Sequence, residues 1–298
     1  ASDVYKRQVR LFTLPGAGSS SIMYYKWIPI IGKQIRLSPL EIPGRGIKER
    51  NKKAVSRRNL IDLLFEDVKL KLKNNEEYMI LGNSSSSIIA IDLCRLIEMH
   101  EFKKPKHIFI AVEPPPDILK NRKKMLEDPK RKNFVKSVFE KYFLDDLITK
   151  EELDKLLSVF LNIVYTNIEK FLDFSVEDMY REIYGDIKLI KGKKYKALEF
   201  VLEHIKLFIE DEKITLEDEI SLLPINVDLT VFGATNDEIA SELELMKWKK
   251  YTCAKFELYM VEGDHLILFN NNETVLQKIQ EKAETILKKF EVNYEIKD

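Results

Sequence analysis

Cysteine and histidine are both scarce in this 298-residue chain, which contains two cysteines and four histidines. The cysteines, Cys94 and Cys253, lie in separate segments with the apolar pattern of helices, so we expect two reduced core residues in a reducing compartment. No group of residues shows metal-ligand spacing. The sequence therefore predicts neither a disulfide framework nor a metal centre, and we expect no protein-bound cofactor.

Long apolar runs are also absent. No stretch of about 18 uncharged apolar residues is present, so we expect no membrane span. The chain does not start with a basic, apolar and small-residue leader, which predicts a cytoplasmic protein, with an organelle-targeting segment removed before residue 1 as the alternative. A hydrophobic content of 45% with 33% charged residues is typical of a globular protein.

The zero net charge hides an asymmetry along the chain. Residues 1–136 contain 28 basic and 15 acidic residues, and the remainder contains 21 and 34. Basic residues concentrate in Lys48–Arg58 and Lys120–Lys132, and aromatic residues do not alternate with them as on a nucleic-acid stacking surface. We therefore expect no nucleic-acid partner. These runs are either solvated surface or a docking face for an acidic partner.

The stretch Tyr78–Arg95 combines a short apolar run, a glycine turn and a helical apolar pattern. Between run and helix, Gly82–Ser86 fits the pattern G-x-S-x-G except that serine replaces the last glycine. Small residues are needed two places from the central serine because a strand that reverses directly into a helix is crowded. The pattern predicts a nucleophile elbow with Ser84 at its tip; a serine-rich cap on an ordinary helix is the alternative.

Strand-like and helix-like segments alternate in the first 116 residues and again after residue 223, which favours a mainly parallel twisted sheet with helices on both faces. The predicted strands are Val9–Leu14, Arg36–Ile42, Tyr78–Leu81, His107–Val112, Asn226–Phe232 and Phe256–Val261. The sequence between the fourth and fifth strands is helical throughout, and Ala240–Thr252, between the fifth and sixth strands, is expected to form one helix. We therefore expect a sheet domain made of residues 1–116 and 224–298, with an inserted all-helical block at 117–223.

Candidate partners for Ser84 follow from their positions after late strands. In α/β-hydrolases the order along the chain is serine, then acid, then histidine. Asp237 follows the fifth predicted strand and His265 follows the sixth, so Ser84, Asp237 and His265 keep that order at the carboxyl ends of strands. Asp264 and Asp228 are rival acids, and we expect both to be worse placed.

Six landmarks in this order resemble the type II, or editing, thioesterases of the α/β-hydrolase superfamily. They are Leu11–Gly18 (family LFxFPxAGG), Tyr24 or Tyr25 with Trp27, Ile42–Gly46 (LPGRG), Gly82–Ser87 (GHSMGA), Phe232–Ser241 (FGGxxDPLVS) and Gly263–Leu268 (GGHFFL). Asn83, Ser86, Glu238 and Asp264 depart from the family pattern, but none of these changes removes a catalytic side chain. The helical block is longer than the lid of the family, with extra sequence at roughly 175–219.

The resemblance implies hydrolysis of acyl thioesters by a serine thioesterase. The acyl group would be carried by the phosphopantetheine of an acyl carrier protein or by CoA, as in polyketide, nonribosomal-peptide and fatty-acid assembly. Ser84, His265 and Asp237 would form the triad, and backbone N–H groups of Ala17 and Ser85 would hold the oxyanion. Two alternatives remain: an oxygen-ester hydrolase with the same triad, or a carrier-binding protein that has lost turnover.

Overall fold

The computed structural model describes residues 7–73, 76–121, 133, 136–137, 149–155, 157–158, 172–185, 192–215 and 223–295. Its sheet has six strands in the order β2-β1-β3-β4-β5-β6, and every neighbouring pair is parallel. The strands are β1 (Val9–Leu14), β2 (Ile35–Pro39), β3 (Glu77–Asn83), β4 (His107–Ala111), β5 (Leu229–Ala234) and β6 (Phe256–Val261). The α/β class that the alternating pattern predicts is therefore confirmed.

Local composition explains most of these strands. β1, β3, β4 and β5 are buried along their whole length, as expected of central parallel strands that are covered on both faces. The predicted bounds of the first and last strands match β1 and β6, whereas β2 ends at Pro39 rather than Ile42. Proline cannot donate to a ladder, so β2 is confined to the edge of the sheet and stops there.

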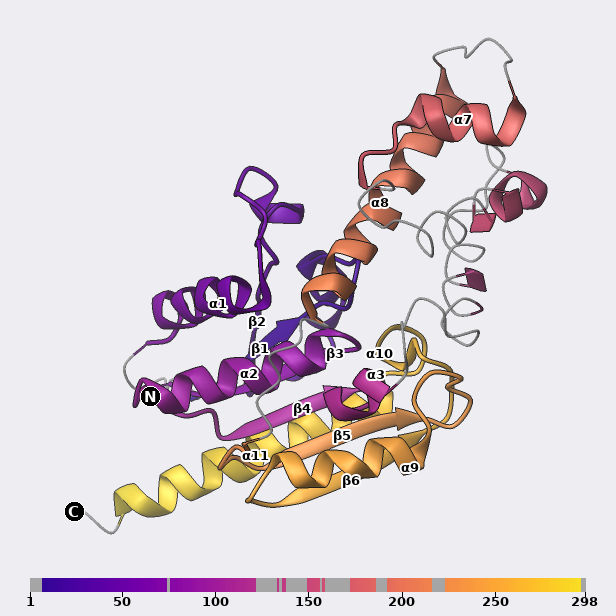
Figure 1. The fold of residues 1–298 in the computed structure, drawn as a ribbon. Coiled ribbons are helices and arrows are strands. Elements are labelled where there is room, and N and C mark those ends of the chain that lie inside the picture. The colour runs from indigo at the N-terminus through magenta and orange to yellow at the C-terminus, as the bar shows by residue number, and fades with distance from the viewer. Residues whose placement is uncertain are drawn as a thin grey trace. The chain divides into compact units, whose positions relative to one another are not determined.

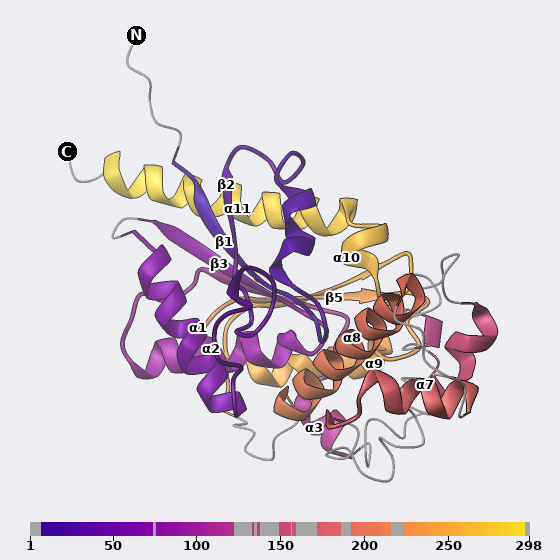
Figure 2. The same cartoon turned by 90° about the horizontal axis from the view of Figure 1, so that it is seen from above.

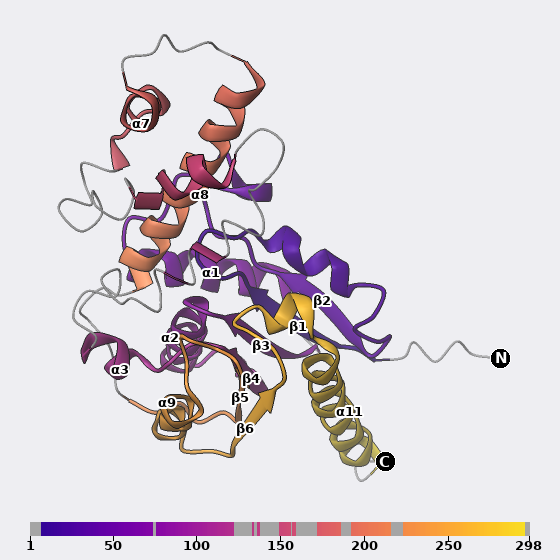
Figure 3. The ribbon, with the colours of Figure 1, turned by 90° about the vertical axis from the view of Figure 1, so that its right-hand side faces the viewer.

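Helices cover both faces of the sheet (Figures 1 and 3). On one face lie α1 (Arg57–Lys71), α2 (Ser86–Met99) and α9 (Glu242–Leu245). On the other face lie the 3₁₀ helix η1 (Ser21–Trp27) and α11 (Glu273–Glu295), and Figure 2 shows α11 on the side of the sheet opposite to α1 and α2. The helix α1 begins where Ser56 accepts a hydrogen bond from the Asn59 N–H, the N-cap arrangement that this sequence favours.

Alternate strand residues form the core beneath η1 and α11. The cluster contains Val9, Leu11, Met79, Leu81, Phe109, Ala111, Phe232 and Val261 from the strands, with Tyr24, Trp27, Val275, Leu276, Ile279 and Ala283 from the covering helices. All are 5% exposed or less. Because the side chains of a strand alternate between faces, the intervening strand residues point toward the face that α1 and α2 cover. The sheet is thus fixed from both faces.

Two local expectations are wrong. The segment Ala240–Thr252 is not one helix: it forms the short α9 followed by the 3₁₀ helix η4 (Met246–Tyr251). Thr252 then pairs with Ile225 in an isolated parallel bridge, which requires extended backbone and so ends the helix. Cys253, in the following bend, is exposed rather than part of the core, whereas Cys94 is buried as expected.

The chain divides into two compact units, one made of Ala1–Ile118 with Glu212–Asp298 and the other of Leu119–Asp211. In the second unit, α7 (Val176–Tyr184) begins with a capping box in which Ser175 and Asp178 exchange hydrogen bonds. Buried apolar residues of α7 and of the helix α8 (Lys193–Thr215), which runs into the first unit, pack together with Leu153 and Leu157. Packing within this unit therefore accounts for the described apolar positions. The domain boundaries expected from the sequence stay a prediction.

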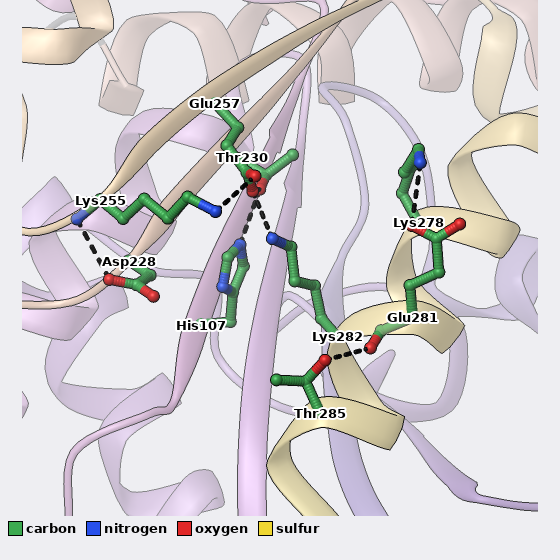
Figure 4. Close-up of polar contacts among 9 residues, drawn as sticks. All are labelled: His107, Asp228, Thr230, Lys255, Glu257, Lys278, Glu281, Lys282 and Thr285. Atoms are coloured by element: carbon green, nitrogen blue, oxygen red, sulfur yellow. Dashed lines mark hydrogen bonds and ion pairs between the residues drawn. The ribbon is translucent and has the colours of Figure 1, made fainter.

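A buried polar network links the first residues of β4, β5 and β6 at the amino end of the sheet (Figure 4). His107 Nε2 lies 2.7 Å from Thr230 Oγ1, and Thr230 donates to Glu257 Oε2 at 3.3 Å. Lys282 and Lys255 pair with the same carboxylate and lower the pKa of Glu257 to about 2 against the effect of its burial. Burial, with a contribution from Lys282, lowers the pKa of His107 to about 3. His107 is therefore neutral at physiological pH.

This network predicts an acid-sensitive contribution to stability. The pKa of His107 is about 3 in the folded protein and 6.5 ordinarily. As pH falls below 6.5, His107 therefore binds a proton in the unfolded chain before it does so in the folded protein. Folding should weaken by up to about 1.4 kcal/mol per pH unit in that window. We expect His107→Gln to reduce this pH dependence in urea unfolding at pH 7 and pH 5, while His100→Gln, at an exposed histidine, leaves it unchanged. Equal pH dependence in all three proteins would contradict the assignment.

Candidate active site

The carboxyl ends of the strands bring the predicted site residues to one edge of the sheet. Ser84 follows β3, Asp237 follows β5 and His265 follows β6. The register pairs Asn83 with Ala111 and Ala234 with Val261, so these strand ends are level. The structure therefore brings together three side chains from loops that are far apart in the sequence, at the edge where open parallel sheets bind their ligands.

The turn between β3 and α2 has the geometry expected of a nucleophile elbow. Ser84 adopts a left-handed backbone conformation with a φ of 49°, which is uncommon for a residue with a side chain. Gly82 lies where a Cβ atom would come within 2.5 Å of the Ser86 carbonyl oxygen and 2.7 Å of Ser87 Cα. Only glycine fits at this crossing of strand and helix, and the crossing lifts the Ser84 side chain away from the sheet.

The hydroxyls of Ser86 and Ser87 donate to backbone carbonyl groups. Ser86 donates to the carbonyl oxygen of Pro15, and Ser87 donates to that of Gly82 at 3.1 Å. Both side chains are buried in the protein interior. Ser84 is the serine of this run whose hydroxyl lies beside His265, which sets it apart from Ser85 and Ser86.

Ser84, His265 and Asp237 form a continuous hydrogen-bonded chain. Ser84 Oγ lies 2.9 Å from His265 Nε2, and His265 Nδ1 lies 2.9 Å from Asp237 Oδ2. Because a carboxylate accepts hydrogen bonds, Nδ1 carries the imidazole proton and Nε2 is left to accept from Ser84. Asp237 is fixed in turn by the backbone N–H of Ile239, which donates to Oδ1 at 2.8 Å. The side chains of Asp237 and His265 are 0% and 5% exposed, so little water competes for these bonds.

The two rival acids are engaged elsewhere. Asp264 Oδ1 accepts from the Leu266 N–H at 2.8 Å, which organises the turn that leads into the helix α10 (Ile267–Asn270). Asp228 precedes β5 and accepts from the Lys255 N–H at 3.1 Å, at the amino end of the sheet. The acid that contacts His265 is therefore Asp237.

The loop after β1 lies against the turn that carries Ser84. A Cβ atom on Gly16 would lie 3.2 Å from Asn83 Nδ2 and 3.4 Å from Ser84 Cβ, so the backbone approaches closely where glycine allows it. Tyr24 donates to the Leu14 carbonyl at 2.8 Å from a fully buried position, and burial raises its pKa. These contacts fix the backbone next to Ala17, the first of the two expected oxyanion donors.

The second expected donor, Ser85, follows Ser84 directly and is the N-cap residue of α2. Within the described residues, neither its backbone N–H nor that of Ala17 has a hydrogen-bond partner. Such N–H groups beside a nucleophile, at the start of a helix, are suited to hold a developing negative charge.

Glu113 is a site residue that the sequence pattern did not reveal. Its Oε2 atom lies 3.4 Å from Ser84 Oγ, and the residue is 0% exposed. The preceding residue, Val112, has a φ of 55°, which is a genuine outlier for a β-branched side chain. The sequence signal for it is its position directly after β4, the strand next to β3, in a Glu-Pro-Pro-Pro run of the kind that ends a strand.

Among the described residues, no group of histidine, cysteine or acidic side chains is arranged to hold a metal ion. In the same part of the chain, no helix is both long enough and apolar enough to cross a membrane.

A family model described as "Thioesterase domain" matches residues 9–283. The chain belongs to the thioesterase domain family. It is 21% identical over 282 residues to the gramicidin S biosynthesis protein GrsT of Aneurinibacillus migulanus, an alignment that covers 94% of this chain and 91% of that protein. The family resemblance drawn from the six sequence landmarks is confirmed.

Solved structures of similar fold include the RedJ thioesterase of the prodiginine pathway in Streptomyces coelicolor. Its TM-score with this chain is 0.63 at 16% sequence identity, and the alignment covers 94% of this chain and 88% of RedJ. The type II thioesterase BorB from the borrelidin cluster has a TM-score of 0.61 at 15% identity, and the alignment covers 95% of this chain and 94% of BorB. This thioesterase-family enzyme therefore has the α/β-hydrolase fold expected from its sequence.

The crowding at the elbow predicts a ranked pair of glycine variants. Gly82→Ala places a methyl group against backbone atoms that cannot move independently of α2, so we expect a loss of about 3 kcal/mol or more of unfolding free energy. Gly16→Ala meets its nearest atoms at 3.2 Å or more and should cost about 1 kcal/mol or less. Urea unfolding of both variants tests the order, and a smaller loss for Gly82→Ala would contradict it.

Proposed function

We propose that this enzyme hydrolyses acyl thioesters through the triad Ser84, His265 and Asp237. The observation that supports this most directly is the pair of 2.9 Å contacts that joins the three side chains. A serine hydroxyl is a weak nucleophile by itself, and a neutral imidazole within hydrogen-bond reach activates it. The membership of the thioesterase domain family supplies the substrate class.

The reaction proceeds in two steps. His265 Nε2 takes the Ser84 proton as Oγ attacks the thioester carbonyl, and the N–H groups of Ser85 and Ala17 hold the oxyanion. Collapse breaks the carbon–sulfur bond and the thiol leaves with the proton from His265. Water then attacks the acyl-serine ester, again losing a proton to His265, which returns that proton to Ser84 as the acid is released. Asp237 maintains the imidazole tautomer and stabilises its cation in both steps.

The acyl carrier is a phosphopantetheine arm of a carrier protein or CoA. Support for this comes from relatives: GrsT is described as a gramicidin S biosynthesis protein, and BorB as a type II thioesterase of the borrelidin cluster. These are assembly-line contexts in which acyl groups travel as thioesters. We propose the same housekeeping, editing or chain-release role for this chain.

The two alternatives make different demands on the site. An oxygen-ester hydrolase would use the same triad and differs only in the leaving group. A carrier-binding protein without turnover would not need Ser84 held in a left-handed conformation 2.9 Å from His265. Such strain persists in proteins where function requires it, and this favours the catalytic interpretation.

The docking role expected for the basic runs has limited support. In Lys48–Arg58, Lys48 pairs with Asp67, Arg57 with Asp92, and Arg58 with Asp62, all within the fold. These pairs reduce the charge available to an acidic partner. The second run, Lys120–Lys132, lies almost entirely outside the described residues.

Ser84→Ala tests the proposed reaction. Removing the nucleophile should lower kcat for acyl-CoA and acyl-phosphopantetheine thioesters by at least about 1,000-fold, because His265 then has no hydroxyl to activate. The measurement is thiol release, with matched oxygen esters assayed in parallel. Unchanged hydrolysis by the variant would refute the proposal, and a clear preference for oxygen esters would favour the esterase alternative.

Replacing the acid that contacts His265 and the acid that precedes it in the sequence separates their roles. Asp237→Asn puts an amide N–H donor against the Nδ1–H of His265 and favours the wrong tautomer, so kcat should fall by roughly 10³- to 10⁴-fold. Asp264→Asn keeps the oxygen that accepts from Leu266 N–H and should change kcat by less than about twofold. Both are measured by steady-state kinetics with a folding check by circular dichroism. A larger effect at Asp264 would contradict the assignment.

A further inference from the structure

The two N–H groups proposed to hold the oxyanion belong to separate segments of the chain. The Ser85 N–H lies at the start of α2, and the Ala17 N–H lies in the loop after β1. The elbow itself is held firmly, because the Ser84 N–H donates to the Ala111 carbonyl at 2.9 Å and the Ser87 N–H donates to the Ser84 carbonyl at 2.8 Å. The position of the loop relative to the elbow therefore decides whether both donors reach one oxygen atom.

The sheet ladder does not extend into this loop. β1 pairs with β3 as far as Leu14, which lies opposite Gly82. The next residue, Pro15, has no N–H group and cannot extend the ladder as a donor. Beyond Leu14, the loop backbone therefore needs other hydrogen bonds to hold it beside the elbow.

Three successive carbonyl groups of the loop accept hydrogen bonds, and two of these bonds are local. The Leu14 carbonyl accepts from the Tyr24 hydroxyl at 2.8 Å, and the Gly16 carbonyl accepts from the Ser19 N–H at 3.0 Å. C=O and N–H point in opposite directions in a trans peptide, so the bond at Gly16 directs the Ala17 N–H. Both donors belong to the segment that follows the loop. These bonds therefore shape the loop but do not tie it to α2.

The third bond joins the loop to α2. The Pro15 carbonyl accepts from the hydroxyl of Ser86, the residue after Ser85. Ser86 is 3% exposed, so water hardly competes for this bond. Pro15 precedes Ala17 by two residues. The Ser86 hydroxyl thus connects the two segments that carry the expected oxyanion donors.

We propose that Ser86 is a positioning residue that sets the spacing of the two oxyanion donors through its hydrogen bond to Pro15. This inference rests on the proposed thioester hydrolysis, and it adds a residue that acts through the loop backbone rather than on the substrate. Negative charge develops on the carbonyl oxygen only as Ser84 attacks, so a misplaced N–H donor lowers kcat much more than it changes KM. A displacement of about 1 Å can lower a rate roughly 100-fold.

Ser86→Ala tests this role, because it removes the hydroxyl and retains the Cβ atom. The substrate is the one that wild-type protein hydrolyses fastest among acyl-CoA thioesters from acetyl to decanoyl. We expect the variant to lower kcat by about 10- to 100-fold and to change KM by less than about threefold. Circular dichroism checks that the variant is folded.

An alkylthio trifluoromethyl ketone provides a second measurement that reports on the oxyanion donors. The Ser84 oxygen adds to the ketone carbon, the carbonyl electron pair moves to oxygen and the serine proton passes to His265, which gives a stable tetrahedral adduct with the oxyanion in place. We expect the inhibition constant to rise by at least about tenfold in Ser86→Ala, in parallel with the fall in kcat.

Ser87→Ala is the matched control. Ser87 also lies in the first turn of α2, is buried and donates to backbone carbonyls, but these belong to Gly82 of β3 and Ala111 of β4 rather than to the loop. The control variant loses the same kind of bond and should lower the free energy of unfolding. Its kcat and its inhibition constant should stay close to those of wild-type protein.

Three results would overturn the inference and leave thioester hydrolysis by wild-type protein intact. They are a kcat for Ser86→Ala close to that of wild type, equal losses of kcat in the two alanine variants, and a lower kcat with an unchanged inhibition constant. If wild-type protein hydrolyses none of the acyl-CoA thioesters, the proposed function fails, and the role of Ser86 fails with it.

Discussion

The site depends on the steric constraint where β3 turns into α2. Gly82 has no room for a Cβ atom, and Ser84 takes a left-handed conformation that most residues avoid. β3 lies inside the sheet between β1 and β4, so hydrogen bonds on both sides fix the position of this turn. A strained residue persists only where the surrounding structure over-determines it, and here the central strand and the helix that follows supply that support.

Strain recurs at the neighbouring strand. Val112 at the end of β4 also has a positive φ, and the two strained residues lie on adjacent strands whose carboxyl ends are level. One sets the direction of the Ser84 hydroxyl and the other that of the Glu113 carboxylate. Because both are anchored to the same rigid sheet, their 3.4 Å separation is a property of the fold rather than of a single loop.

A hydrogen bond accommodates the departure from the family pattern at the last residue of the elbow. Ser86 replaces the last glycine of the elbow, and its hydroxyl donates to the Pro15 carbonyl in the loop that carries Ala17. Asn83 is buried, with its amide against Gly16. Polar side chains in these buried positions are acceptable when they find partners. The serine-rich turn that carries Ser84 is therefore bonded to the loop that contains Ala17.

The sequence by itself determined the apolar strand segments, the glycine turn and the order of Ser84, Asp237 and His265 along the chain, because each of these can be recognised from the residues in their linear order. Only the tertiary structure decided which side chains meet. It broke the expected helix at 240–252 to pair Thr252 with Ile225, and it exposed Cys253. It also placed Glu113 beside Ser84, since that contact depends on the register of β3 with β4, a long-range property that no local pattern encodes.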